Sequence, residues 1–169
     1  MKKIPAHLKK NPRYQGVITL QKIKKGSYSN LLLAQVIEKS QFKTEDSHLF
    51  TELVYGTLMH ELTLEYQLSP FLKKPEKLPP NIYMLLKTAF YQLFFLDRIP
   101  DHAVLNESVN LAKEMENAPM GKLVNGVLRQ ALRKGLLGYE QLTGADRLEK
   151  EFSFPKPLTE FLTPQLGFD

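Results

Sequence analysis

The chain has 169 residues, of which 43% are hydrophobic and 24% are charged, and this composition is typical of a globular domain with a hydrophobic core. It contains no cysteine, which excludes disulfides, thiolate metal ligands and a cysteine nucleophile, and its four histidines lack ligand-like spacing, so we expect no metal site. The longest apolar stretch, residues 82–96, is shorter than the about 20 residues that cross a bilayer. We therefore expect a cytoplasmic protein that makes no contact with membranes.

Basic residues are concentrated near the N-terminus. Residues 1–26 contain eight basic side chains and no acidic one, although the formal net charge of the whole chain is only +5. The rest of the chain is therefore net negative, and this asymmetry favours a polyanionic partner. The alternative is a solvated terminus that only keeps the protein soluble. If nucleic acid binds here, the candidate contact residues are Lys9, Lys10, Arg13, Lys22 and Lys25.

The first predicted helix begins at Pro12 with Asn11 as its N-cap and stops at Gly26. Tyr14 and Tyr28 lie close to the basic residues and are candidates for stacking on bases. A helical wheel turns Tyr14 away from the core, whereas for Tyr28 we expect burial.

Two further helices are predicted in the first half of the chain. Ser29 should cap one that ends near Lys39, and Thr44 should cap a long one that continues to Leu68. Gly56 lies inside the long helix, where glycine costs about 1 kcal/mol relative to alanine. It therefore predicts a close crossing with another helix.

The second half is also helical. One predicted helix begins near Pro80 and is apolar on most sides, and the next is capped by Asp101. In "LVNGVLR", residues 123–129, the Asn-Gly pair is a hairpin signal, but the flanking apolar residues recur with helical spacing. We predict a helix that ends at Gly135, in which Gly126 lets a neighbouring helix come close.

Beyond Gly138, turn residues and prolines separate short helical pieces. We predict one helical domain over residues 1–138, and a short helical linker over residues 139–169 that starts the connection to a further domain. No segment shows strand periodicity, so the predicted fold class is all-α.

The sequence offers no catalytic constellation: it lacks a glycine-rich phosphate loop, a nucleophilic serine motif and a zinc-protease spacing. Asn106, Glu107 and Asn125 are expected to form a structural polar joint between two consecutive helices, with Glu107 within reach of Arg129. Alternatively, Arg129 and Arg133 extend a nucleic-acid face.

The segments "DRIPDHAVLNESVNLAKEM" and "KLVNGVLR", preceded by "GSYSN", "ELVYGTLMH" and "AFYQLFFLD", resemble the NusB-like domain from Asn11 to Arg133. The resemblance implies an all-helical RNA-binding bundle. This domain occurs alone as the transcription antitermination factor NusB, and as the N-terminal domain of the RsmB (Sun/Fmu) family, which methylates carbon 5 of a cytosine in 16S rRNA. Arg129, where the free-standing factor usually has aspartate, and the segments "YQL" and "IPDHA" favour the methyltransferase family.

This resemblance implies that S-adenosylmethionine and the catalytic cysteines belong to a separate domain, so that the chain itself is non-catalytic and binds no cofactor. We therefore expect the N-terminal part of a methyltransferase, which docks the enzyme on 16S rRNA and is monomeric. The alternatives are a free-standing NusB-type factor that binds RNA and a protein, and a helical adaptor that binds only protein.

Overall fold

The computed structural model describes residues 4–154, and the prolines Pro155, Pro157 and Pro164 of the predicted linker lie outside them. The helices are α1 (Ala6–Lys9), α2 (Pro12–Lys24), α3 (Ser29–Ser40), α4 (Thr44–Met59), α5 (Glu61–Leu68), α6 (Pro80–Phe95), α7 (Asp101–Met115), α8 (Ala118–Lys134) and α9 (Gly144–Phe152), with single 3₁₀ turns at Ser69–Phe71 and Pro75–Lys77. The described residues contain no strand, which confirms the all-α fold. None of these helices combines the length and apolarity needed to cross a membrane.

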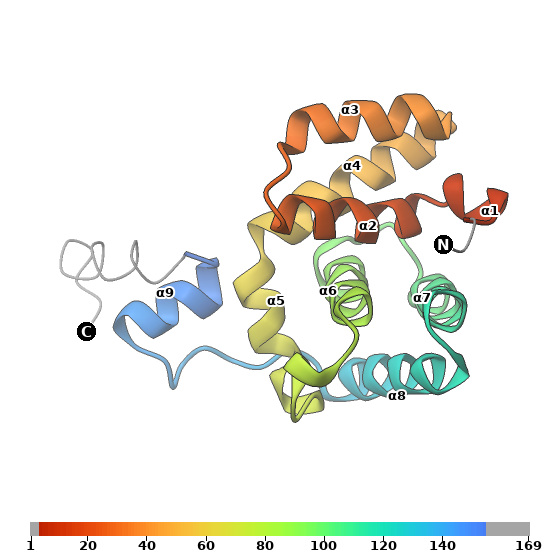
Figure 1. Ribbon diagram of the computed structural model, residues 1–169. Helices are drawn as coiled ribbons and strands as arrows, with labels where there is room; N and C mark the ends of the chain where they lie inside the picture. The colour runs from red at the N-terminus through yellow and green to blue at the C-terminus, as the bar shows by residue number, and fades with distance from the viewer. Residues whose placement is uncertain (1–3, 155–169) are drawn as a thin grey trace.

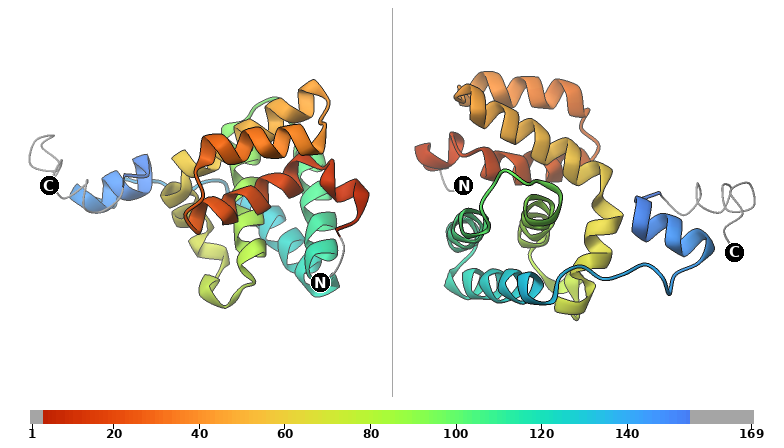
Figure 2. Two further views of the ribbon diagram at one scale, coloured as in Figure 1. Left: turned by 45° about the horizontal axis from the view of Figure 1, so that its top comes forward. Right: turned by 180° about the vertical axis from the view of Figure 1, so that it is seen from behind.

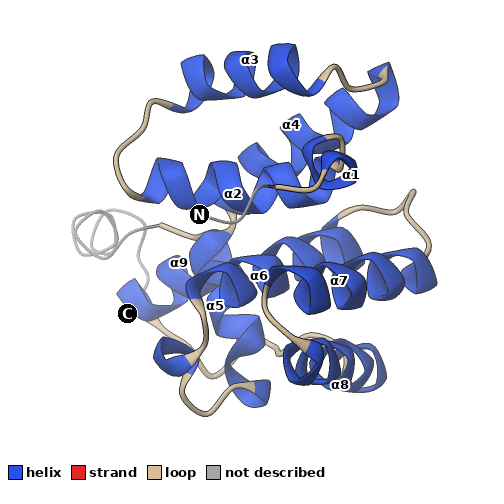
Figure 3. Ribbon diagram, turned by 45° about the vertical axis from the view of Figure 1, so that its right-hand side comes forward, coloured by secondary structure: helices blue, strands red, loops and turns tan. Residues whose placement is uncertain are grey.

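The helices form two groups around α6. Figure 1 shows α2, α3 and α4 on one side, and α8 crossing on the other side beneath α6 and α7. The views in Figures 2 and 3 agree with this division. Helix α6 packs against α2, α4, α5, α7 and α8, and its buried residues Leu85, Leu86, Ala89 and Phe90 lie at the centre of the core. The near-continuous apolar sequence of α6 fits this central position.

The N-cap residues predicted from the sequence are confirmed only in part. Asn11 caps α2 as predicted, because its Oδ1 accepts hydrogen bonds from the backbone N–H groups of Arg13 and Tyr14 at 2.9 and 3.0 Å. The predicted caps Ser29, Thr44 and Asp101 are wrong: each is the first helical residue, and the cap position one residue earlier makes no side-chain hydrogen bond. A side chain that is already inside the helix no longer occupies the extended cap position that reaches the first free N–H groups.

The predicted helix over residues 44–68 is divided at His60 into α4 and α5. The ring of His60 lies 4.6 Å from the ring of Phe95 and 5.9 Å from that of Tyr91, both on α6. The change of direction lets both halves pack against α6 (Figure 1). Tertiary packing has therefore overridden a continuous helical pattern.

Gly56 and Gly126, the two helical glycines at which a close approach was predicted, have different surroundings. A Cβ on Gly56 would lie 2.0 Å from Cζ of Tyr91, which confirms the predicted close crossing of α4 and α6. A Cβ on Gly126 would meet nothing within 4 Å, so the close approach predicted there is wrong. Gly126 lies on the exposed face of α8.

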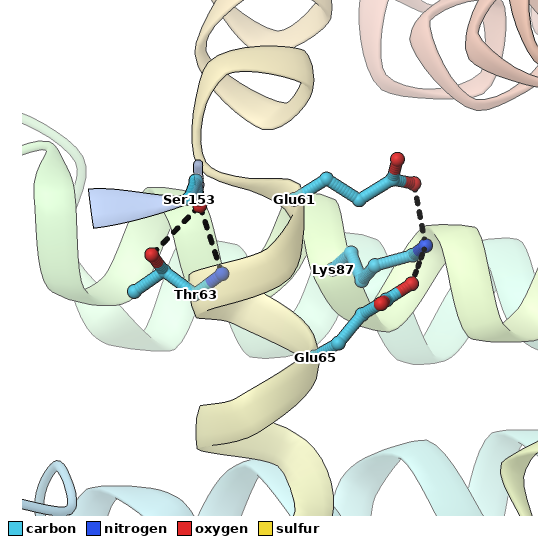
Figure 4. A network of polar contacts seen from close by, with 5 residues as sticks. All are labelled: Glu61, Thr63, Glu65, Lys87 and Ser153. Carbon is cyan, nitrogen blue, oxygen red and sulfur yellow. Dashed lines mark hydrogen bonds and ion pairs between the residues drawn. The ribbon is translucent and has the colours of Figure 1, made fainter. Parts of the chain in front are cut away.

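The described part of the predicted linker is packed against α5. Gln67 of α5 is buried and forms hydrogen bonds to both the N–H (2.6 Å) and the C=O (3.1 Å) of Leu137. In α9, Leu148 is buried, and the hydroxyl of Ser153 accepts a hydrogen bond from the backbone N–H of Thr63 at 2.8 Å (Figure 4). Residues 137–153 thus extend the helical bundle, while a domain boundary near Gly138 stays a prediction.

Candidate nucleic-acid interface

Lys9 and Lys10 belong to the end of helix α1, which packs against the rest of the protein. The side chain of Leu8 in α1 is buried, and His7 Nε2 lies at hydrogen-bond distance, 2.7 Å, from Glu114 Oε2 of α7. Lys9 and Lys10 at the end of α1 are exposed. Lys9 and Lys10 therefore end a helix that packs against α2 and contacts α7, and they do not belong to a free arm.

Helix α2 separates a buried face from a basic one. Val17 and Leu20 are fully buried in the core, whereas Lys22, Lys24 and the C-cap residue Lys25 are exposed. The helix contains no acidic residue. Its lysines therefore add their positive charge without a neutralising partner on the same helix.

A groove between α2 and α3 collects three of the lysines. Lys9, Lys22 and Lys39 line it together with the amide side chains of Gln15 and Gln35. The remaining lining residues are apolar or hydroxyl-bearing, so no carboxylate of the described residues lines the groove. Lysine charge combined with amide hydrogen-bond donors and acceptors suits a phosphate backbone. Lys39 is not among the contact residues predicted from the sequence, although it is the basic residue in the last turn of the second predicted helix.

Arg13, in contrast to the lysines of α1 and α2, is partly buried. Its Nε donates a 2.8 Å hydrogen bond to Oε1 of Gln92, which is buried on α6. Burial lowers the pKa of the Arg13 guanidinium, and the nearby charges of Glu107 and Asp46 act in the opposite direction. The guanidinium stays protonated in any case. Arg13 thus joins α2 to α6 and lies partly inside the protein.

The two tyrosines are placed opposite to the prediction. Tyr14 is only 8% exposed, and its side chain lines a cleft together with Leu8 of α1 and Met115 of α7. Tyr28, for which burial was expected, is 85% exposed. A wheel drawn for one helix cannot show which other elements cover it.

The polar joint is assembled differently from the prediction. Arg129 Nε donates to Oδ1 of Asn125, one turn earlier on α8, at 2.9 Å, and within residues 4–154 it makes no ion pair with Glu107. Glu107 instead acts electrostatically on Arg13. Asn106 and Glu107 are exposed on α7, and among the described residues neither forms a hydrogen bond or ion pair with Asn125.

Arg129 and Arg133 are exposed on α8, on the other side of α6 and α7 from α2 and α3 (Figure 1). The structure therefore separates the predicted RNA-contact residues into two faces. In the part of the chain that the structure describes, no group of three or more histidine, aspartate or glutamate side chains is arranged to hold a metal ion.

Comparison with known proteins agrees with this architecture. The sequence pattern of the NusB family matches residues 10–133. The chain is 38% identical over 144 residues to a probable ribosomal RNA small subunit methyltransferase B of Bacillus subtilis, an alignment that covers 85% of this chain and 32% of the relative. It is 37% identical over 105 residues to the transcription antitermination protein NusB of Nitrosospira multiformis, covering 61% of this chain and 66% of that protein.

The chain thus spans about a third of the length of the methyltransferase relative. A chain in a crystal structure of a plectonemic RNA supercoil has the same fold, with a TM-score of 0.65 and 22% identity over 75% of this chain and 95% of that chain. The matched residues include every helix from α2 to α8. The chain therefore belongs to the NusB family.

Proposed function

We propose that this chain is the RNA-docking domain of a ribosomal RNA small subunit methyltransferase, and that RNA lies along the groove between α2 and α3. The observation that carries the proposal is the gathering of Lys9, Lys22 and Lys39 in a groove without carboxylates among its described lining residues, on a domain of the NusB family. Lys10 and Lys25 are exposed nearby in the chain and would add phosphate contacts at its ends.

Two observations favour the methyltransferase over the free-standing factor. The alignment with the methyltransferase of B. subtilis is longer than that with the N. multiformis NusB protein, 144 against 105 residues. The packing of residues 137–153 on α5 extends the structure beyond residue 133, where the match to the family pattern stops.

The cofactor of the whole enzyme would be S-adenosylmethionine, bound outside this chain, and its substrate would be 16S rRNA in the cytoplasm. The domain itself would act as a monomer without catalytic residues.

Replacing all three groove lysines tests the proposal. The variant Lys9→Gln/Lys22→Gln/Lys39→Gln should bind a 16S rRNA fragment about ten-fold or more weakly at low salt, because three phosphate contacts are lost. The slope of log affinity against log salt should fall by about two to three. Fluorescence anisotropy with a labelled RNA measures both quantities.

The matched control removes the same charge elsewhere. Lys73, Lys74 and Lys77 are exposed in the connection between α5 and α6 and do not line the groove, and Lys73→Gln/Lys74→Gln/Lys77→Gln should retain most of the affinity. Equal losses in the two triple variants would show that only net charge matters and that the groove has no special role.

A further inference from the structure

We infer that Tyr28 is a stacking platform for one unpaired base of the RNA whose backbone lies in the groove. This inference rests on the proposed function and deepens it, because it assigns a base contact to a surface otherwise described only by charge. Tyr28 is 85% exposed, the largest exposed fraction of any large hydrophobic side chain in the described residues. Base-stacking sites on RNA-binding proteins use aromatic rings presented in this way.

The backbone that carries this ring is fixed on both sides. Before it, the N–H of Ser27 donates to the C=O of Lys22 at 3.1 Å, and after it, the C=O of Tyr28 accepts from Leu32 at 3.1 Å in the first turn of α3. Asn30 Oδ1 accepts a 2.5 Å hydrogen bond from the hydroxyl of Tyr55 on α4. The ring is thus exposed on a rigid backbone, so that little backbone entropy is lost when a base stacks on it.

The charges around Tyr28 fit a polyanion. Lys22, Lys24 and Lys25 precede it at the end of α2, and the first acidic residue of the chain is Glu38, at the far end of α3. A phosphate next to a stacked base would meet cations within a few residues of the aromatic ring. The combination of an exposed aromatic ring and neighbouring lysines is typical of single-stranded nucleic-acid sites.

Tyr28 also lies beyond the end of the groove that Lys22 and Leu32 line. Lys22, from the last turn of α2, and Leu32, one turn after Tyr28, both line the groove, while Lys9 and Lys39 line it from the ends of α1 and α3. Figure 1 shows the connection between α2 and α3 rising from the C-terminal end of α2 to the start of α3. An RNA strand that follows the groove past Lys22 therefore reaches the connection that carries Tyr28.

A protein partner fits this surface less well. Next to Tyr28, the exposed apolar surface consists of Leu31, which is 62% exposed, and the intervening residues Ser29 and Asn30 are polar. So small an apolar area is far below that of a stable protein–protein interface. It is sufficient for one nucleobase, and the adjoining lysines would repel a basic partner surface.

Affinity measurements separate stacking from charge. Tyr28→Ala should weaken binding of an unstructured oligouridylate of about ten residues at least about five-fold, whereas Tyr28→Phe should leave the affinity within about two-fold of the unchanged chain. Inorganic polyphosphate of similar length, which has phosphates but no bases, should bind all three proteins equally. An equal loss for RNA and polyphosphate in Tyr28→Ala would overturn the base contact.

A fluorescent reporter gives an independent test, because the chain contains no tryptophan. Tyr28→Trp should show emission that oligouridylate quenches on binding and polyphosphate does not. Phe152→Trp is the matched control, since Phe152 is 48% exposed on α9, and its emission should not change with either ligand.

The outcomes distinguish the two proposals. If the unchanged chain binds no RNA at low salt, the proposed function fails. If it binds RNA with a normal salt dependence, but Tyr28→Ala binds equally well and RNA leaves the emission of the Tyr28→Trp variant unchanged, the stacking platform alone is wrong and a protein contact becomes the better explanation of the exposed ring.

Discussion

At the scale of single residues, Gly56 and Gly126 illustrate how surroundings set the role of a glycine. Both lie in helices, where alanine is intrinsically favoured by about 1 kcal/mol. Around Gly56, however, the Tyr91 ring occupies the space of a Cβ, and that ring is itself stacked on Phe95 with centroids 5.7 Å apart. Around Gly126 the space is open.

Alanine substitution should therefore have opposite effects at the two positions. Gly56→Ala should lower the free energy of unfolding by about 1–2 kcal/mol, because overpacking outweighs the gain in helix propensity. Gly126→Ala should raise it by about 0.5–1 kcal/mol. Urea unfolding followed by circular dichroism measures both, and stabilisation by Gly56→Ala would show that the crossing of α4 and α6 can open at little cost.

At the scale of elements, the contact between α5 and α6 depends on a buried cation. Lys87 of α6 is fully buried, and its Nζ lies 2.6 Å from a carboxylate oxygen of Glu61 and 2.9 Å from one of Glu65, one turn apart on α5 (Figure 4). Nζ also lies 4.6 Å from the centre of the Tyr83 ring. Two carboxylates and an aromatic face offset the desolvation of the ammonium group.

Two substitutions of Lys87 should separate charge from volume. Lys87→Met keeps the aliphatic stem but leaves two half-buried carboxylates without a partner, and we expect a loss of about 1–3 kcal/mol in unfolding free energy. Lys87→Ala adds a cavity, and the expected loss is about 3–5 kcal/mol. Adding Glu61→Gln and Glu65→Gln to Lys87→Met should recover part of the loss in urea unfolding. No recovery would mean that the ion pairs add nothing to the helix contact.

Helices were predicted correctly where capping residues, turn residues or periodicity within the segment itself indicate them. The start of α2 at Pro12 and the end of α8 before Gly135 follow from capping and turn residues. The helix predicted through "LVNGVLR" is confirmed, because periodicity extends over several turns whereas a hairpin signal rests on two residues. The division at His60 has no such signal, since it depends on both halves contacting α6.

At the scale of the whole molecule, the basic residues form two separated faces. The groove lysines lie on α1, α2 and α3, and Arg129 and Arg133 lie on α8 across the bundle. The contribution of Arg129 and Arg133 to RNA binding can therefore be measured separately from that of the groove.

The double variant Arg129→Gln/Arg133→Gln makes that measurement. It should bind an oligonucleotide of about ten residues within about two-fold of the unchanged chain, because the groove would hold such a ligand. The groove triple variant should lose about ten-fold under the same conditions. If the arginine pair costs as much as the three lysines, the primary RNA site lies on α8.

The sequence by itself determined the helical fold class, the positions of most helices, the close crossing at Gly56 and the concentration of positive charge at the N-terminus. These follow from periodicity, capping and composition, which are properties of neighbouring residues. Tertiary structure alone decided that Arg13 is held by Gln92, that Lys39 joins Lys9 and Lys22, that Tyr14 is covered and that Tyr28 is exposed. Exposure and partners depend on which distant elements pack over a residue, and no local pattern contains that information.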